Sequence, residues 1–139
     1  MVIEAVRNVE PEEGFFEMLS KETKRMGVPL IVDEVSSGFR MNCGGAHLII
    51  GLNPDMAVFA KGISNGYPMG IILGKKEFMD AAQDSFISST YWTERIGPVA
   101  AIATIKKMRQ QNVQKHLMES GKKIQEGWAA LAKKHGLHV

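Results

Sequence analysis

The sequence predicts an α/β fold in which helices flank a mostly parallel sheet. A β-prone run, a helical run and a second β-prone run follow one another over residues 2–32, the order of a β-α-β unit. Two more short apolar runs follow at residues 56–59 and 69–73, and each ends close to a charged residue or a glycine. The length of 139 residues suits one domain, and no repeat or linker divides the chain.

The first three elements follow from the spacing of their apolar residues. Residues 2–6 are β-prone and predict a short strand. In residues 12–26 the apolar positions recur at helical spacing after a proline and acidic residues, so we expect an amphipathic helix that stops at Gly27. Residues 28–32 are continuously apolar and end at Asp33, which is typical of a buried strand in a parallel sheet.

The remaining elements alternate between short strands and helices. The run at residues 56–59 predicts a strand that ends at Lys61, followed by a loop over residues 62–68. We also expect a helical turn at 47–51, a strand at 69–73, a short helix at 77–83, an alanine-rich helix at 97–110, and a last helix with an apolar stripe of Val113, Leu117, Ile124, Trp128 and Leu131. The charged residues of that last helix are interpreted as a solvated face.

Composition and charge exclude several classes of protein. With 45% hydrophobic and 23% charged residues, the chain has the composition of a globular domain rather than a disordered, collagenous or coiled-coil protein. A net charge of +2 is too small to indicate nucleic acid or an anionic membrane surface as a partner. The longest apolar runs are much shorter than the roughly 20 residues of a membrane span, and charged residues near the start disfavour a signal peptide. We therefore expect a cytoplasmic protein with no membrane or nucleic-acid partner.

Cysteine, histidine and glycine patterns argue against metal and nucleotide sites. Cys43 is the single cysteine, which excludes an internal disulfide or a Cys-x-x-Cys motif and fits a reducing compartment. The four histidines include no His-Glu-x-x-His pair, so we expect no metal. Residues 70–76, GIILGKK, differ from a phosphate-binding P-loop because three residues rather than four separate the glycines and no Ser or Thr follows the first lysine.

Two titratable residues stand at the carboxyl ends of predicted buried strands. Asp33 follows one strand and Lys61 follows the next, and ligands of open α/β sheets bind at this edge. An amine that can form a Schiff base and a carboxylate that can keep a pyridine nitrogen protonated match pyridoxal phosphate (PLP) chemistry. Spacing alone leaves two other interpretations open: Asp33 could cap the following loop, and Lys61 could be a solvated strand end.

Three ordered motifs carry a resemblance to a known family. They are residues 30–40, LIVDEVSSGFR, then Pro54-Asp55, then residues 61–70, KGISNGYPMG. In this order they closely resemble the class III aminotransferases, with the glutamate-1-semialdehyde aminomutase branch as the nearest likeness. The resemblance runs through nearly all of the chain, and it implies the large PLP-binding domain of a fold type I enzyme.

The resemblance implies a role for each matched residue. Asp33 would pair with the pyridinium nitrogen, Val35 would pack on the ring face, and Lys61 would form the Schiff base and move a proton between the substrate Cα and C4′ of the cofactor. Opposite charges favour each other's charged forms, which suits Asp33 to this partner. Glu34 belongs to the same motif, and a structural hydrogen bond is the expected role.

A threonine before the next long helix binds the cofactor phosphate in this family, and the other subunit of a homodimer contributes it. Alignment on the alanine-rich helix selects Thr90, whereas alignment on Pro98 selects Thr93; we favour Thr90. Residues 89–95, STYWTER, depart from the family's usual small-residue run, a difference that concerns the substrate pocket rather than the cofactor. Trp92 could line that site or an interface, although plain packing is the commoner role of an aromatic residue.

The resemblance implies that residues 1–139 are a central part of the large domain, with no second domain. The family's phosphate-cradling loop, its cofactor-stacking aromatic residue and its small terminal domain would lie outside this chain. The expected function is transamination, or aminomutase chemistry, on an amino acid or amino-ketone. The alternative is a truncated α/β fragment without independent activity.

Overall fold

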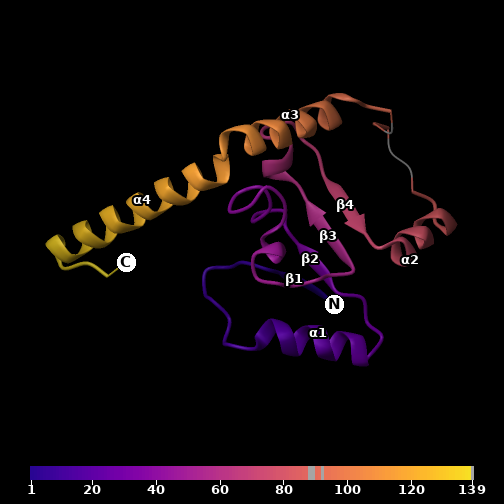
Figure 1. The fold of residues 1–139 in the computed structure, drawn as a ribbon, viewed down its shortest axis with the longest axis horizontal. Coiled ribbons are helices and arrows are strands. Elements are labelled where there is room, and N and C mark those ends of the chain that lie inside the picture. The colour runs from indigo at the N-terminus through magenta and orange to yellow at the C-terminus, as the bar shows by residue number, and fades with distance from the viewer. Residues whose placement is uncertain (88–89, 92, 139) are drawn as a thin grey trace.

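The computed structural model describes residues 1–87, 90–91 and 93–138, and it shows a four-stranded sheet with helices beside it (Figure 1). The strands are β1 (Val2–Glu4), β2 (Ile31–Asp33), β3 (Met56–Phe59) and β4 (Ile71–Gly74). The helices are α1 (Phe15–Arg25), α2 (Lys76–Met79), α3 (Ile96–Gln111) and α4 (Val113–His135), with short 3₁₀ turns η1 (Ala46–Leu48), η2 (Lys61–Ile63) and η3 (Asp80–Asp84). The predicted α/β class is confirmed.

The sheet has the order β1-β2-β3-β4, and its first three strands are parallel. β1 and β2 are joined through α1, the crossover that parallel neighbours require. β4 is antiparallel to β3, because the short connection between them leaves no room for a crossover helix. The parallel pairing of β2 with β3 places Asp33 opposite Val58, so both strands end at the same edge of the sheet.

Several boundaries differ from the prediction, and two of the differences have a local reason. α1 begins at Phe15 rather than at residue 12, because Gly14 adopts a left-handed conformation with φ 82° that is incompatible with helix continuation. The turn η2 begins at Lys61, where a strand end and a loop were expected. Both deviations occur where a residue has positive φ, a feature that apolar spacing does not reveal.

The core consists of two clusters of buried apolar side chains. The first contains Val32 and Leu30, and Phe16 and Leu19 of α1 pack against it. The second contains Ala57, Phe59, Ile63 and Ala101, and joins β3 to α3. α1 and α3 lie on opposite sides of the strands (Figure 1). These clusters fix β2 and β3, the strands whose ends carry Asp33 and Lys61.

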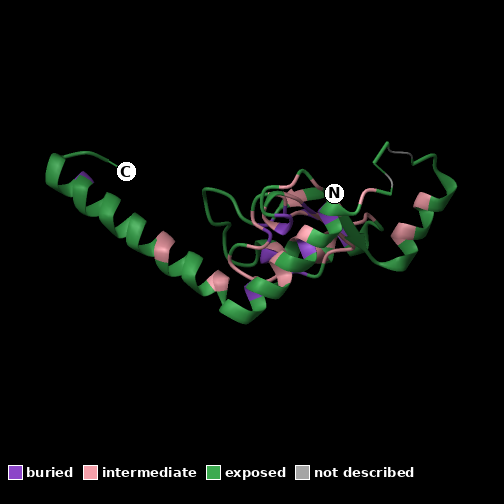
Figure 2. Ribbon diagram, turned by 90° about the horizontal axis from the view of Figure 1, so that it is seen from above, coloured by how far each residue is buried: buried purple, intermediate pink, exposed green. Residues whose placement is uncertain are grey.

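α4 projects away from the rest of the chain and is mostly exposed (Figure 2). Its predicted apolar stripe is present, but Leu117, Ile124, Trp128 and Leu131 have exposed fractions of 42–59%. Its other surface carries the ion pairs Lys115–Glu119 and Lys122–Glu126, at 3.9 and 3.8 Å. Of the helices within residues 1–87, 90–91 and 93–138, none combines the length and apolarity needed to cross a membrane.

Candidate active site

The structure places Asp33 and Lys61 at the ends of neighbouring parallel strands. Asp33 is the last residue of β2. β3 ends at Phe59, and Lys61 comes after one intervening residue, Ala60. Two segments leave this edge of the sheet: the β2 loop (residues 34–45) and the β3 turn (residues 60–63). They contact each other directly. The juxtaposition expected from strand order is therefore present.

Lys61 has a strained backbone and a specific side-chain partner. Its φ is 45°, in the left-handed region that residues with a side chain seldom adopt. Its amine Nζ donates a hydrogen bond of 2.8 Å to Oγ of Ser36 in the β2 loop. Strain of this kind persists where the surrounding structure determines the conformation, and it is concentrated at functional sites. Lys61 is exposed, but its amine is held against the loop that follows Asp33.

The side chain of Asp33 forms a hydrogen bond within the loop that follows it. Its Oδ1 accepts a hydrogen bond of 2.8 Å from the backbone N–H of Val35. The side chains of Asp33 and Val35 are both half-buried. The loop-capping role that spacing had left open is thus observed, and a carboxylate with a second oxygen keeps capacity for a further partner.

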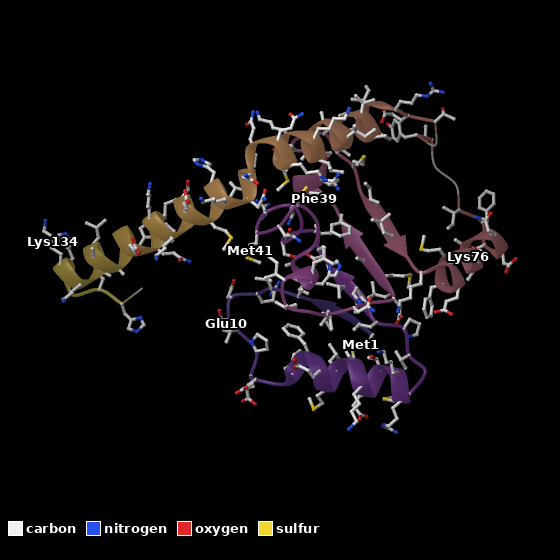
Figure 3. The ribbon with its side chains drawn as sticks, viewed as in Figure 1. Met1, Glu10, Phe39, Met41, Lys76 and Lys134 are labelled. Atoms are coloured by element: carbon white, nitrogen blue, oxygen red, sulfur yellow. The ribbon has the colours of Figure 1, made fainter. Side chains whose placement is uncertain are left out.

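Two glycines allow the β2 loop and the β3 turn to interlock. A Cβ on Gly62 would lie 2.9 Å from the carbonyl oxygen of Gly38, and a Cβ on Gly38 would lie 2.7 Å from both the Glu34 carbonyl oxygen and a ring carbon of Phe59. Contacts this short are not tolerated by real side chains. Phe39 adds an edge-to-face contact with Phe59, with ring centroids 5.6 Å apart; it lies between the strands and α3 (Figure 3).

Glu34 is the buried polar centre of this region. Its side chain is fully buried and accepts hydrogen bonds from the Ser37 hydroxyl at 2.5 Å and from the His47 backbone N–H at 2.8 Å. The ring nitrogen Nδ1 of His47 lies 2.8 Å from the same Glu34 oxygen. The structural role expected for Glu34 from its motif is what the geometry displays.

The hydrogen bonds also set the charge state of Glu34. Burial acts to raise the pKa of this carboxyl. The hydrogen bonds from Ser37, from the backbone N–H groups of His47 and Ala46, and from the His47 ring outweigh burial and lower the pKa below its ordinary value. Glu34 is therefore a buried carboxylate that ties the start of the β2 loop to η1.

A polar cavity opens at the carboxyl edge of the sheet. It has a volume of about 350 Å³, and Ser36, Ser37, Arg40, Arg7, Asn8 and Glu4 contribute to its lining. A larger cavity of about 560 Å³ lies between β3, β4 and α3, and its lining is mostly apolar. Neither cavity is lined by Asp33 or Lys61. The smaller cavity is the better candidate for polar chemistry, because it shares Ser36 with the amine of Lys61.

The segment before α3 stands apart from this edge. It contains Thr90 and Thr93, both exposed, and lies on the far side of β4 from the β2 loop (Figure 1). Trp92 falls outside the described residues. Glu94 caps α3 by accepting hydrogen bonds from the backbone N–H groups of Ile96 and Gly97. The side-chain partner of Lys61 is Ser36, not Thr90 or Thr93.

Ser36 is the site residue that the sequence reasoning missed. It lies inside the motif that contains Asp33, yet its partner comes from a different strand, which spacing along the chain cannot indicate. Among residues 1–87, 90–91 and 93–138, no group of three or more His, Cys, Asp or Glu side chains is arranged to hold a metal ion.

Comparison with known proteins identifies the family of the chain. The family model of class III aminotransferases matches residues 3–139. A 3-aminobutyryl-CoA aminotransferase from Cloacimonas acidaminovorans is 35% identical over 115 residues, covering 82% of this chain and 28% of the relative. A glutamate-1-semialdehyde 2,1-aminomutase from Natranaerobius thermophilus is 37% identical over 134 residues, covering 94% of this chain and 31% of the relative.

Solved structures give the same result for the fold. The FumI protein of Sphingopyxis sp. MTA144, in its PLP internal aldimine form, superposes with a TM-score of 0.90 at 28% identity, covering 97% of this chain and 34% of that one. An S-selective transaminase from Bacillus megaterium gives a TM-score of 0.79 at 26% identity, covering 96% and 30%. The chain thus spans about a third of the length of these proteins. The match over residues 3–139 shows that the chain belongs to the class III aminotransferase family.

Proposed function

We propose that this chain forms the lysine-bearing part of a PLP-dependent aminotransferase or aminomutase. The observation that carries the proposal is the meeting of the Lys61 amine with the loop that follows Asp33, beside a polar cavity at the carboxyl edge of the sheet. The donor set fits the cofactor, because a primary amine and a carboxylate are the two groups that PLP requires of a protein. Family membership supports the same assignment.

Each residue of the candidate site has a separate role in such a reaction. PLP, when bound, supplies an aldehyde that condenses with amines and a ring that withdraws electrons from the substrate Cα. Lys61 would hold the cofactor through Nζ and, when free, would move a proton between the substrate Cα and C4′ of the cofactor. Asp33 would favour the protonated ring nitrogen through its negative charge. Val35, half-buried beside Asp33, would pack against the ring face.

Thr90 is proposed to reach the cofactor phosphate from a second copy of the chain, with Thr93 as the alternative. The segment that carries both threonines lies beyond β4, away from the Lys61 side of the same copy (Figure 1). A homodimer with a shared site would bring them together. The substrate class is an amino acid or amino-ketone. Relatives named as aminotransferases and as aminomutases are both similar to this chain, so transfer to an acceptor and internal migration are both compatible with it.

Addition of PLP to the protein tests this proposal. We expect a visible absorption band from the Schiff base, lost in Lys61→Ala and retained in Lys123→Ala, which removes an exposed amine on α4. A band of equal intensity in Lys61→Ala would refute the role of Lys61. Turnover of an amino donor by the loaded protein would exclude the non-catalytic fragment, whereas binding without turnover would favour it.

A further inference from the structure

The amine of Lys61 has a partner that the proposed mechanism does not use. Nζ donates to Oγ of Ser36 over 2.8 Å, and the two residues come from different strand ends. A lysine side chain at the surface has many accessible rotamers, and holding it in one of them costs a substantial amount of conformational entropy. A hydrogen bond at its tip therefore selects one position for the amine.

Ser36 is itself held in place on both sides. Its carbonyl oxygen accepts a hydrogen bond of 2.5 Å from Nε of Arg40. The neighbouring Ser37 is anchored by its hydroxyl to the buried carboxylate of Glu34. The Ser36 hydroxyl is thus presented by a segment whose backbone is fixed, although its own side chain is exposed.

The distance between the two strand ends is set by backbone contact. Gly62, directly after Lys61, lies against the carbonyl of Gly38, and nothing larger than hydrogen fits between them. This approach brings the β3 turn within reach of the Ser36 hydroxyl. The left-handed φ of Lys61 turns the chain at the same point.

We propose that Ser36 is a positioning residue for Lys61, an inference that rests on the proposed function. Its hydroxyl holds the Lys61 amine, and Ser36 also helps to line the polar cavity. In this position the amine meets an entering aldehyde without first searching its rotamers. Loss of the Ser36 hydroxyl slows the capture of PLP by Lys61. Threonine keeps a hydroxyl on Cβ and therefore preserves the capture rate.

The first test needs no cofactor. In ¹⁵N-lysine NMR spectra of the protein, the Lys61 ammonium signal is assigned by its loss in Lys61→Ala, and its hydrogen exchange is compared with that of the exposed Lys123. We expect the Lys61 exchange to be about threefold to tenfold faster in Ser36→Ala than in the wild type, as the modest net strength of one hydrogen bond allows. Ser36→Thr should restore slow exchange. Ser85→Ala, which removes an exposed hydroxyl bonded to the carbonyl of Ala82, should change nothing.

The second test measures the rate at which PLP is captured, followed by absorbance. We expect Ser36→Ala to slow capture about threefold to tenfold and Ser36→Thr to keep most of the rate. Unchanged exchange in Ser36→Ala would overturn the pairing, and unchanged capture would overturn the positioning role. A third outcome is possible: Lys61 exchanges faster in Ser36→Ala, but the PLP-treated wild type shows no Schiff-base absorbance. This result would refute the proposed function and would leave the Ser36–Lys61 hydrogen bond in place.

Discussion

The strand-end region and α4 differ in how much of their structure is determined by contacts. At the strand ends, a buried carboxylate, two glycines without room for a side chain and an aromatic pair fix the β2 loop against the β3 turn. α4 is a regular helix of 23 residues whose apolar stripe faces water. The comparison shows that the position of the Lys61 amine is restricted by contacts from several segments, whereas the apolar stripe of α4 has few such contacts within the chain.

The comparison predicts that the two regions respond very differently to substitution. Stability should depend strongly on side chains with few exposed atoms at the strand ends, and weakly on the large exposed side chains of α4. The following changes test this contrast, and their stability effects are measured by chemical denaturation of the protein.

Glu34→Gln should have the largest effect, a loss of about 2–3 kcal/mol in the free energy of unfolding at pH 7, because hydrogen bonds to a buried charge are lost or weakened. Because the pKa of Glu34 is lowered on folding, the folded state binds this proton less readily than the unfolded state. Its contribution is complete above the ordinary value of 4.5 and is lost as the pH falls through the lowered folded pKa. The gap between wild type and variant should therefore narrow below about pH 4.5.

The matched change on α4 is Glu119→Gln, which breaks an exposed ion pair with Lys115. It should alter stability by less than about 0.5 kcal/mol. Equal losses for Glu34→Gln and Glu119→Gln would contradict the contrast between the two regions.

Gly38→Ala should destabilise by about 1–3 kcal/mol, because its Cβ would overlap the Glu34 carbonyl and the Phe59 ring. The control is Gly121→Ala on α4, where a Cβ meets no atom within 4 Å. Denaturation midpoints of the two variants should move in opposite directions. A Gly38→Ala protein as stable as the wild type would show that the close approach of Gly38 to the Glu34 carbonyl and the Phe59 ring is not required.

Gly127→Ala should raise the stability of α4 by about 0.5–1 kcal/mol, since alanine is the better helix former and the position opens to free space. Slower amide hydrogen exchange along α4, with unchanged exchange in β2 and β3, is the expected result. Slower exchange throughout the sheet would show that the two regions are coupled.

Trp128→Ser should have the smallest effect, within about 0.5 kcal/mol, because the side chain is 59% exposed. A loss of more than about 2 kcal/mol in the free energy of unfolding is typical of substitutions in a packed core. Such a loss would mean that other protein atoms cover the apolar stripe of α4. An analytical ultracentrifugation run at the same protein concentration would then show whether a second copy provides the cover.

Much of the fold was predictable because it depends on local patterns. The apolar run at residues 56–59 coincides with β3, and the alanine-rich run gives α3 with a boundary shift of one residue at each end. The start of α1 and the turn η2 were not predicted, since both depend on a residue with positive φ. The antiparallel direction of β4 follows from a short connection rather than from its composition.

The site was predictable to the extent that it depends on strand order. The positions of Asp33 and Lys61 follow from two strands that end at one edge. The contacts of Ser36 and the interlocked glycines join segments distant in sequence, so no local pattern encodes them. The choice between Thr90 and Thr93 also stays a prediction, because both are exposed and neither is the side-chain partner of Lys61.

Reduction of the PLP-treated protein with borohydride, followed by peptide mapping, tests the central claim most directly. Borohydride makes the Schiff base permanent and so marks the lysine that captured the cofactor. Our account predicts that the label falls on Lys61 and that Asp33→Asn weakens its formation. A label spread over surface lysines, or concentrated on a lysine other than Lys61, would contradict it.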